Sequence, residues 1–146
     1  MRFENRTNYQ IITDAIYKAD SLLSPESVMA KDIIQKNDWK YGAPKSGSLV
    51  LLRLVATQPK PIPVFTYKPK KPTLATGHVD AIGIHLNVNL IDKIQLSEVV
   101  GFALHEWAHV CDFDYWSPFG TSNFRTKNKE LYSVNYWLTA NAWRWV

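Results

Sequence analysis

The spacing of apolar residues along the chain predicts several short helices and strands. Residues 8–23 carry apolar side chains at helical spacing, which predicts an amphipathic helix. Residues 24–26, Ser-Pro-Glu, supply an N-cap, a first-turn proline and an early acid, and they predict the start of a second, shorter helix. The leucine-rich and β-branched run at residues 48–56 favours a buried strand, and residues 64–67 favour a short edge strand.

Further patterns follow in the C-terminal half of the chain. From residue 80 to residue 90, apolar side chains alternate with mostly polar ones, which predicts one half-buried strand. Ser97 is a good N-cap for the next helix. That helix is expected to run to about residue 111 and to be central and buried, because its faces are largely apolar. Thr126 can cap a final helix that runs from residue 127 to near the C-terminus and carries Glu130 in its first turn.

The segment His105-Glu106-Trp107-Ala108-His109 places two imidazoles four residues apart within the buried helix. Each α-helical residue turns by about 100°, so His105 and His109 project about 40° apart, near enough for both rings to bind one metal ion. Glu106 then lies beside that ion. Zinc bound by neutral imidazoles lowers the pKa of its water, and a carboxylate within reach can take the proton as general base. The motif therefore predicts a catalytic Zn²⁺ site.

The third zinc ligand has to come from outside the five-residue motif, because catalytic zinc usually keeps three protein ligands. Asp112 shares the helical stripe of the histidines but lies about 10 Å along the axis from His105, at about 1.5 Å per residue. It suits better a supporting role, accepting a ring N–H of a ligating histidine or anchoring the helix end, with direct ligation as the alternative. Glu130, on a separate helix, can approach from another direction and is the preferred third ligand. A solvent-exposed glutamate that interacts with the helix dipole is the competing interpretation.

Residues 80–135 resemble the gluzincin branch of the zincin metallopeptidases, in which an HExxH helix is followed by a helix that supplies a glutamate ligand. The resemblance implies His105, His109 and Glu130 as zinc ligands and Glu106 as the general base. It also implies an edge strand that borders the cleft and pairs with an extended substrate. In this chain, the resemblance places that edge strand at Gly83, His85, Asn87 and Asn89.

Residues 105–120, HEWAHVCDFDYWSPFG, also resemble small phage-encoded zincin-like proteins that show HEWxHxxD followed by an FG-containing loop. That group favours a histidine just after FG, where this chain has Thr121. The NExxSD-like sequence of the gluzincin glutamate helix is also absent around Glu130. The third ligand therefore stays open between Glu130, Asp112 and another group.

These observations lead to the hypothesis of a zinc-dependent endopeptidase that acts on peptide or protein substrates. Stabilising the oxyanion formed during hydrolysis needs a further polar side chain near the cleft, and Tyr132 and Tyr136 are possible donors, as are His85 and Arg125. The alternative is a zincin-fold binding protein with a structural or vestigial zinc site, acting on nucleic acid or a protein partner. Glu106 separates the two hypotheses, because a structural zinc site has no use for a base.

Composition narrows the fold class but adds little to the function. With 146 residues, of which 46% are hydrophobic, residues 1–146 suit a single zincin-like domain of the α+β class. We expect a small, mostly antiparallel sheet with an edge strand beside a central HExxH helix, and a C-terminal helix.

A formal net charge of +4 without a basic recognition motif does not favour nucleic acid as a partner. The sequence shows no signal peptide or membrane segment, so a cytoplasmic location is expected, and the lone Cys111 agrees with it. The sequence does not predict the oligomeric state.

Overall fold

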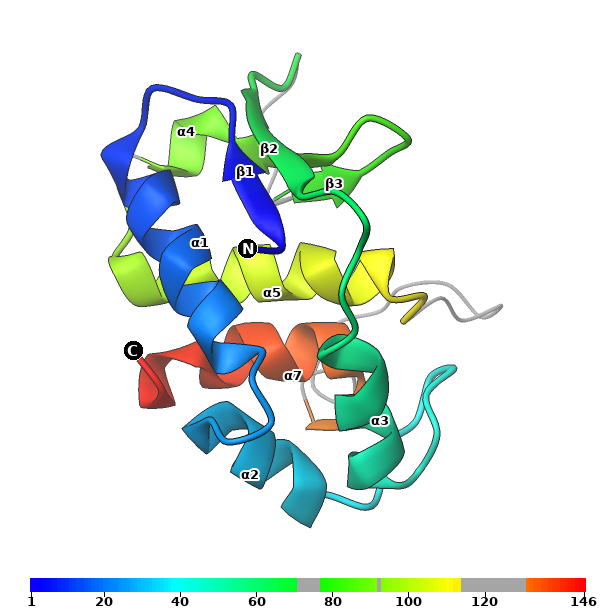
Figure 1. The fold of residues 1–146 in the computed structure, drawn as a ribbon. Coiled ribbons are helices and arrows are strands. Elements are labelled where there is room, and N and C mark those ends of the chain that lie inside the picture. Colours follow the sequence, from blue (N-terminus) through cyan, green and yellow to red (C-terminus); the bar gives the residue numbers. More distant parts are fainter. Residues whose placement is uncertain (71–76, 92, 114–130) are drawn as a thin grey trace.

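The computed structural model describes residues 1–70, 77–91, 93–113 and 131–146 (Figure 1). Within these ranges, helices surround and support one small sheet of four strands. In chain order the elements are β1 (Phe3–Asn5), α1 (Gln10–Leu22), α2 (Val28–Gln35), α3 (Gly47–Leu54), β2 (Ile62–Tyr67), β3 (Gly77–Val79), β4 (Ile84–Asn87), α4 (Val88–Ile91), α5 (Leu96–Val110), α7 (Val134–Asn141) and the 3-10 turn η1 (Ala142–Arg144). The chain is thus a mixed helix and strand protein, in agreement with the predicted α+β class.

The sheet has the strand order β1-β2-β4-β3, and two of its three pairings are parallel. β1 pairs with β2 and β2 pairs with β4 in parallel, whereas β3 runs antiparallel to β4. The prediction of a mostly antiparallel sheet is therefore wrong. Parallel neighbours need a long crossover connection, and α1, α2 and α3 together provide it between β1 and β2.

The run at residues 48–56 forms the helix α3, so its prediction as a buried strand is wrong. Val50, Leu51 and Leu54 are buried, while Leu49 and Leu52 are 52% and 67% exposed. This distribution follows the helical repeat of 3.6 residues, which places one apolar face inward. Leucine is also a strong helix former, so a leucine-rich run of this length does not by itself indicate a strand.

The alternating run at residues 80–90 is only partly a strand, because it contains a turn, β4 and the start of α4. The backbone N–H of Asp80 donates to the carbonyl of Gly83 at 3.1 Å. Its side-chain oxygen Oδ1 accepts from the N–H groups of Ile82 and Gly83 at 2.8 and 3.1 Å. An aspartate that bonds the backbone two and three residues ahead stabilises a turn, and here the turn joins β3 to β4 in a hairpin.

This hairpin also corrects the expected substrate strand. β4 contains His85 and Asn87 and is hydrogen-bonded to β2 on one side and to β3 on the other, so it is not an edge strand. Gly83 lies in the turn before β4, and Asn89 lies in α4. Within the described residues the edge strands are β1 and β3, and β3 is the one that contacts α5 more extensively. Residues 64–67, predicted as an edge strand, lie in β2, which is also internal in the sheet.

The predicted helices at residues 8–23 and 97–111 are confirmed as α1 and α5, and the second helix as α2, with differences at their ends. The N-cap of α2 is Ser27, whose hydroxyl accepts from the Ala30 N–H at 3.0 Å, and not Ser24. α5 begins at Leu96 after Gln95, which forms a reciprocal capping box with Glu98. The expected start of the last helix, at residues 126–130, lies outside the described residues. Its expected course to near the C-terminus as one helix is wrong, because Ser133 caps a separate helix, α7, which ends at Asn141.

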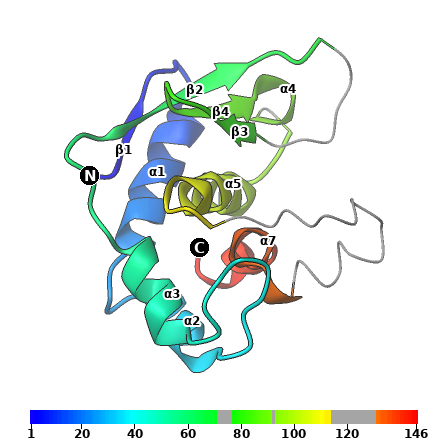
Figure 2. The same ribbon diagram turned by 90° about the vertical axis from the view of Figure 1, so that its right-hand side faces the viewer.

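α5 occupies the centre of the fold, with the sheet on one side and α1 and α7 on others, as Figure 2 shows with this helix seen end-on. Trp107 anchors it. The indole N–H of Trp107 donates to the carbonyl of Leu54 at 2.8 Å, and its ring lies 5.4 Å from that of Phe3, measured between centroids. Because all three side chains are buried, the packing fixes the rotation of α5 about its axis.

The C-terminal end of α5 is closed by a Schellman motif. The N–H of Phe113 donates to the carbonyl of Ala108 at 2.9 Å, and the N–H of Asp112 donates to that of His109 at 3.0 Å. Asp112 takes the left-handed position with a φ of 64°, where glycine is the usual residue. Arg53 adds a bond from its guanidinium to the carbonyl of Cys111 at 2.9 Å. The helix that carries the motif is therefore held firmly at its end.

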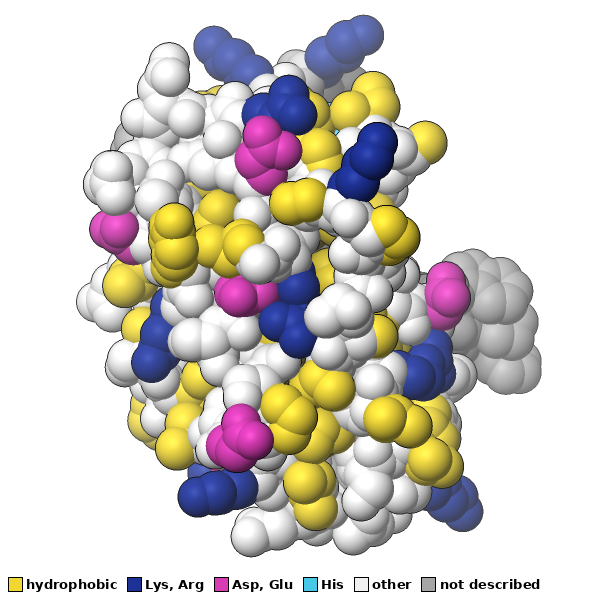
Figure 3. Space-filling view, in the orientation of Figure 1, with side chains coloured by type: hydrophobic (Ala, Val, Ile, Leu, Met, Phe, Trp, Pro, Cys, Tyr) yellow, Lys and Arg dark blue, Asp and Glu magenta, His cyan; other side chains and the backbone are white. Residues whose placement is uncertain are grey.

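The surface gives no indication of a concentrated basic patch on the face drawn in Figure 3, where Lys and Arg side chains are scattered among acidic ones. In the described part of the chain, no helix has the length and apolar character needed to cross a membrane.

Candidate active site

His105 and His109 lie one turn apart on α5, as the motif requires. Their ring centroids are 5.3 Å apart, with an angle of 67° between the ring planes. His105 is 7% exposed, and His109 is half-buried. The two imidazoles therefore sit side by side where the helix leaves the core, close enough to share one metal ion.

Helix α7 contacts both the ring and the main chain of His105. The Nδ1 atom of His105 lies 3.1 Å from the Thr139 hydroxyl oxygen, and that hydroxyl donates to the carbonyl of Asn135 at 3.2 Å. With the hydroxyl donating to this carbonyl, its oxygen is an acceptor for Nδ1–H in the tautomer that carries the ring proton on Nδ1. The lone pair of the ring is then on Nε2, which is the arrangement that a metal-binding histidine needs.

The electrostatic surroundings of His105 favour the same neutral ring. Burial lowers its pKa to about 3, with a further contribution from a positive charge on His109. The amide of Asn135 donates to the main-chain carbonyl of His105 at 3.1 Å, which ties α7 to α5 at this point. A neutral imidazole matches the requirements of a zinc ligand.

Glu106 is a buried carboxylate, 2% exposed, on the adjacent position of α5. Its Oε2 atom is buried without a hydrogen-bond partner in the described part of the chain. Burial raises its pKa from 4.5 to about 7. A carboxyl group in this range can both accept and release a proton near neutral pH, which is the property of a general acid and base.

A cavity of about 360 Å³ opens beside Glu106 and His109, and its opposite wall is the edge strand β3. The residues that line it are Gly77, His78, Val79, Glu106 and His109. A Cβ atom at Gly77 would lie 2.5 Å from the carbonyl oxygen of His85 and 3.4 Å from Oε1 of Glu106. Glycine therefore allows the edge strand to approach both β4 and the carboxylate closely.

The described residues do not complete a three-ligand site around His105 and His109. Among them, the one group of three metal-ligating side chains is formed by other residues of the sheet. Asp112 is exposed and takes part in the turn that ends α5. Two supporting roles were expected for it, accepting a ring N–H of a ligating histidine or anchoring the helix end, and its position suits the second. Glu130, the preferred third ligand, lies outside the described residues.

The two candidate oxyanion donors lie in different surroundings. Tyr136 packs against His105, with ring centroids 5.2 Å apart and an angle of 83°. The ring of Tyr132 instead lies below the ammonium groups of Lys36 and Lys40, at 5.2 and 4.2 Å. Of the two, Tyr136 is the residue that the structure brings to the motif. Arg125, the other distant candidate, lies outside the described residues.

The expected substrate-strand residues are placed away from the cavity or inside the sheet. His85 lies on the outer face of the sheet, with its Nε2 2.9 Å from Oδ2 of Asp80 and its ring stacked on Phe65. Asn87 is buried, and its side chain accepts from the N–H of Asn89 at 3.0 Å at the start of α4. These two asparagines therefore shape the end of β4.

Sequence reasoning missed the residues of α7 that support the motif, Asn135 and Thr139, and the edge strand that faces it. No local signal marks the α7 residues, because they act through packing between distant helices. Tyr67 was also missed, and its pKa is raised by burial and by the negative charge of Glu106. The strand β3 could have been found from the Asp80 to Gly83 turn.

Comparison with known proteins gives no family for the chain: no family model matches it, and no curated protein or solved structure matches it either. The interpretation of the site therefore depends on its own geometry.

Proposed function

We propose that this protein is a zincin-like, zinc-dependent peptidase whose active site is the cavity between α5 and the edge strand β3. One observation carries the proposal. Glu106, whose Oε2 has no hydrogen-bond partner in the described part of the chain, lines the same cavity as His109 and the residues of β3. A base, a metal-binding group and a strand edge are the three parts that metal-assisted peptide hydrolysis needs in one place.

His105 and His109 would hold the zinc ion, together with Glu130 as the ligand expected from the sequence. The neutral state of His105 and its hydrogen bond to Thr139 fit this role. The chemistry that zinc supplies when bound is Lewis-acid activation of water and of the peptide carbonyl. Glu106 takes a proton from the attacking water and returns it to the nitrogen of the leaving amine, and a pKa near 7 suits both transfers.

The substrate would bind as an additional strand. β3 uses one edge to pair with β4, and its other edge is the border of the sheet. An extended peptide can bond to that border through its main chain, which gives affinity with little dependence on side chains. Because Gly77 brings this strand close to Glu106, the peptide main chain would pass within reach of the base.

The burial of Glu106 supports catalysis over a purely structural zinc site. A buried carboxyl without a hydrogen-bond partner costs stability, on the order of 1–3 kcal/mol. A structural metal site gains nothing from such a group, whereas a general base needs a free oxygen and a raised pKa. In the alternative, a binding protein with a vestigial site, the buried carboxyl group would lower stability and have no role.

The decisive experiment compares the wild type with Glu106→Gln and with Glu98→Gln, which removes an exposed carboxylate from the same helix. The substrates are a diverse pool of unstructured peptides, and the products are read by mass spectrometry. We expect cleavage by the zinc-loaded wild type and by Glu98→Gln, and none by Glu106→Gln at equal zinc content. Undiminished cleavage by Glu106→Gln would contradict the proposed base. Failure of the loaded wild type to cleave any peptide would favour the binding protein.

A further inference from the structure

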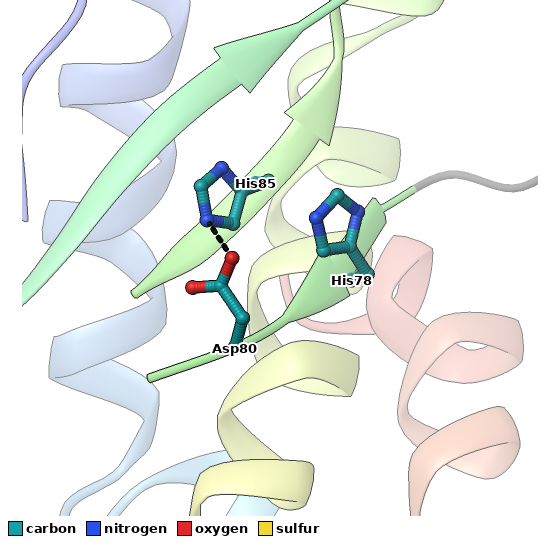
Figure 4. A group of neighbouring side chains, drawn as sticks. All are labelled: His78, Asp80 and His85. Carbon is teal, nitrogen blue, oxygen red and sulfur yellow. Dashed lines mark ion pairs between the residues drawn. The ribbon is translucent and has the colours of Figure 1, made fainter. Parts of the chain in front are cut away.

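Three metal-ligating side chains meet on the β3–β4 hairpin, and one of them, His78, also belongs to the lining of the cavity beside the HExxH motif. His78 comes from β3, His85 from β4 and Asp80 from the turn between them (Figure 4). Each offers one ligand atom, and these atoms all lie within 4.8 Å of one another. Two imidazoles and one carboxylate on a single hairpin make a compact set of donors of the kinds that divalent transition metals prefer.

The hairpin register fixes this arrangement. His78 and His85 are direct partners across the antiparallel pair, so their side chains leave the same face of the sheet. Their rings stack with centroids 4.6 Å apart and planes at 11°. Phe65 of β2 stacks on the other side of His85, with centroids 5.3 Å apart. The positions of both imidazoles therefore follow from strand pairing.

Asp80 is held in place by its own turn. Its Oδ1 atom accepts the N–H groups of Ile82 and Gly83, which leaves Oδ2 directed at His85 Nε2 at 2.9 Å. The hydrogen bond to His85 lowers the pKa of Asp80 to about 2, with help from the N–H of Ile82. The carboxylate is thus ionised at neutral pH.

The spacing of the donors suits a small tetrahedral ion. With bonds of about 2.0–2.2 Å, two ligands of one tetrahedral zinc ion lie about 3.3–3.6 Å apart. The separation of 2.9 Å between Asp80 and His85 needs to open slightly, and the wider spacing to His78 needs to close. Both changes are small side-chain rotations, because His78 and Asp80 are exposed. Harder ions such as Mg²⁺ prefer sets made of oxygen and fit this one poorly.

We propose that His78, Asp80 and His85 form a second binding site for a divalent transition metal ion of the zinc class. The proposal does not rest on the peptidase function. An ion bound here would connect β3 to β4 through side chains, in addition to their backbone hydrogen bonds. Because β3 also forms a wall of the cavity beside Glu106, this ion would hold the edge strand in the position that borders the candidate active site.

The test measures zinc stoichiometry and affinity by calorimetry on protein without an affinity tag. His78→Ala removes an exposed ligand, and Asp80→Asn removes the charge while keeping an oxygen for the turn. Asp38→Asn is the matched control, since Asp38 is an exposed aspartate paired with Lys36 at 2.7 Å. We expect two zinc ions per wild-type chain and per Asp38→Asn chain. In the hairpin variants, the affinity for one of the two zinc ions should fall. The fall should exceed the 10- to 100-fold loss that is typical when a residue that only hydrogen-bonds to a ligand is removed.

A second measurement assigns the ion to its residues. In His105→Ala/His109→Ala, added Zn²⁺ should shift the imidazole ¹⁵N resonances of His78 and His85, and Mg²⁺ should not. Unchanged zinc binding in both His78→Ala and Asp80→Asn would overturn the proposal, because the Asp80–His85 ion pair would then be only a structural contact. If the double variant fails to fold, the His85 resonances decide the question: added Zn²⁺ should shift them in the wild type and much less in His78→Ala.

Discussion

Replacing Glu106 by glutamine should stabilise the metal-free protein at alkaline pH and much less at acidic pH. The glutamine keeps the size of the side chain and removes its ionisation. Because Glu106 is 2% exposed and one of its oxygens has no hydrogen-bond partner in the described part of the chain, the folded state favours the protonated form. The charged form is the one that destabilises the fold.

The pKa values give the sign and the size of this effect. Glu106 has a pKa of about 7 in the folded protein, against its usual 4.5, so between these values the folded state binds more protons than the unfolded state. Stability then falls as the pH rises from 4.5 to 7, and the loss is complete above pH 7. Since one pKa unit corresponds to about 1.4 kcal/mol, the full loss is about 3 kcal/mol.

The assay is urea unfolding of the wild type and Glu106→Gln at pH 4.5 and pH 8 with a chelator present. The difference in unfolding free energy between the two proteins should shift by about 3 kcal/mol in favour of the variant at the higher pH. The contribution of His105, whose lowered pKa reduces stability as the pH falls below 6.5, is present in both proteins and cancels to first order. Glu98→Gln controls for the loss of one carboxylate from α5. A difference that does not change with pH would refute the assigned environment of Glu106.

Three further predictions follow from the site. Thr139→Val removes the acceptor for Nδ1–H of His105, so zinc affinity should fall by about 10- to 100-fold in competition with a chromophoric chelator, and unchanged affinity would contradict the assigned tautomer. Gly77→Ala places a Cβ 2.5 Å from a carbonyl oxygen of β4, so it should lower the unfolding free energy by about 1–3 kcal/mol and slow peptide cleavage. Glu130→Ala should weaken zinc binding more than Asp112→Ala does, and the reverse order would transfer the ligand role to Asp112.

The parts of the structure that the sequence predicted are those encoded by local pattern. The helices α1 and α5 were predicted because their apolar residues recur at helical spacing over more than three turns. The juxtaposition of His105 and His109 depends only on the geometry of one helix, so it too was predictable from the spacing of two residues. The burial of Glu106 follows from the apolar character of the whole helix around it.

Predictions failed where distant segments decide the outcome. A short apolar run such as residues 48–56 has similar local features in a buried strand and in a helix, and its packing determines which forms. Strand order also depends on connections, and the helices between β1 and β2 made these two strands parallel. The edge strand beside the motif was predicted at the residues of β4 and is β3 instead. The reason is a turn at Asp80, which interrupts an alternation that looks continuous in the sequence.

The contact between α7 and α5 explains why the support of the motif could not be predicted. Gly101 lies one turn before His105 on α5, and a Cβ there would lie only 3.2 Å from the carbonyl oxygen of Thr139 and from Cβ of Ala142. The missing side chain lets α7 approach closely, so the hydroxyl of Thr139 comes within 3.1 Å of His105 Nδ1. A glycine in a helix normally costs stability. Here it allows a residue 34 positions away in the sequence to contact the ring of a proposed zinc ligand.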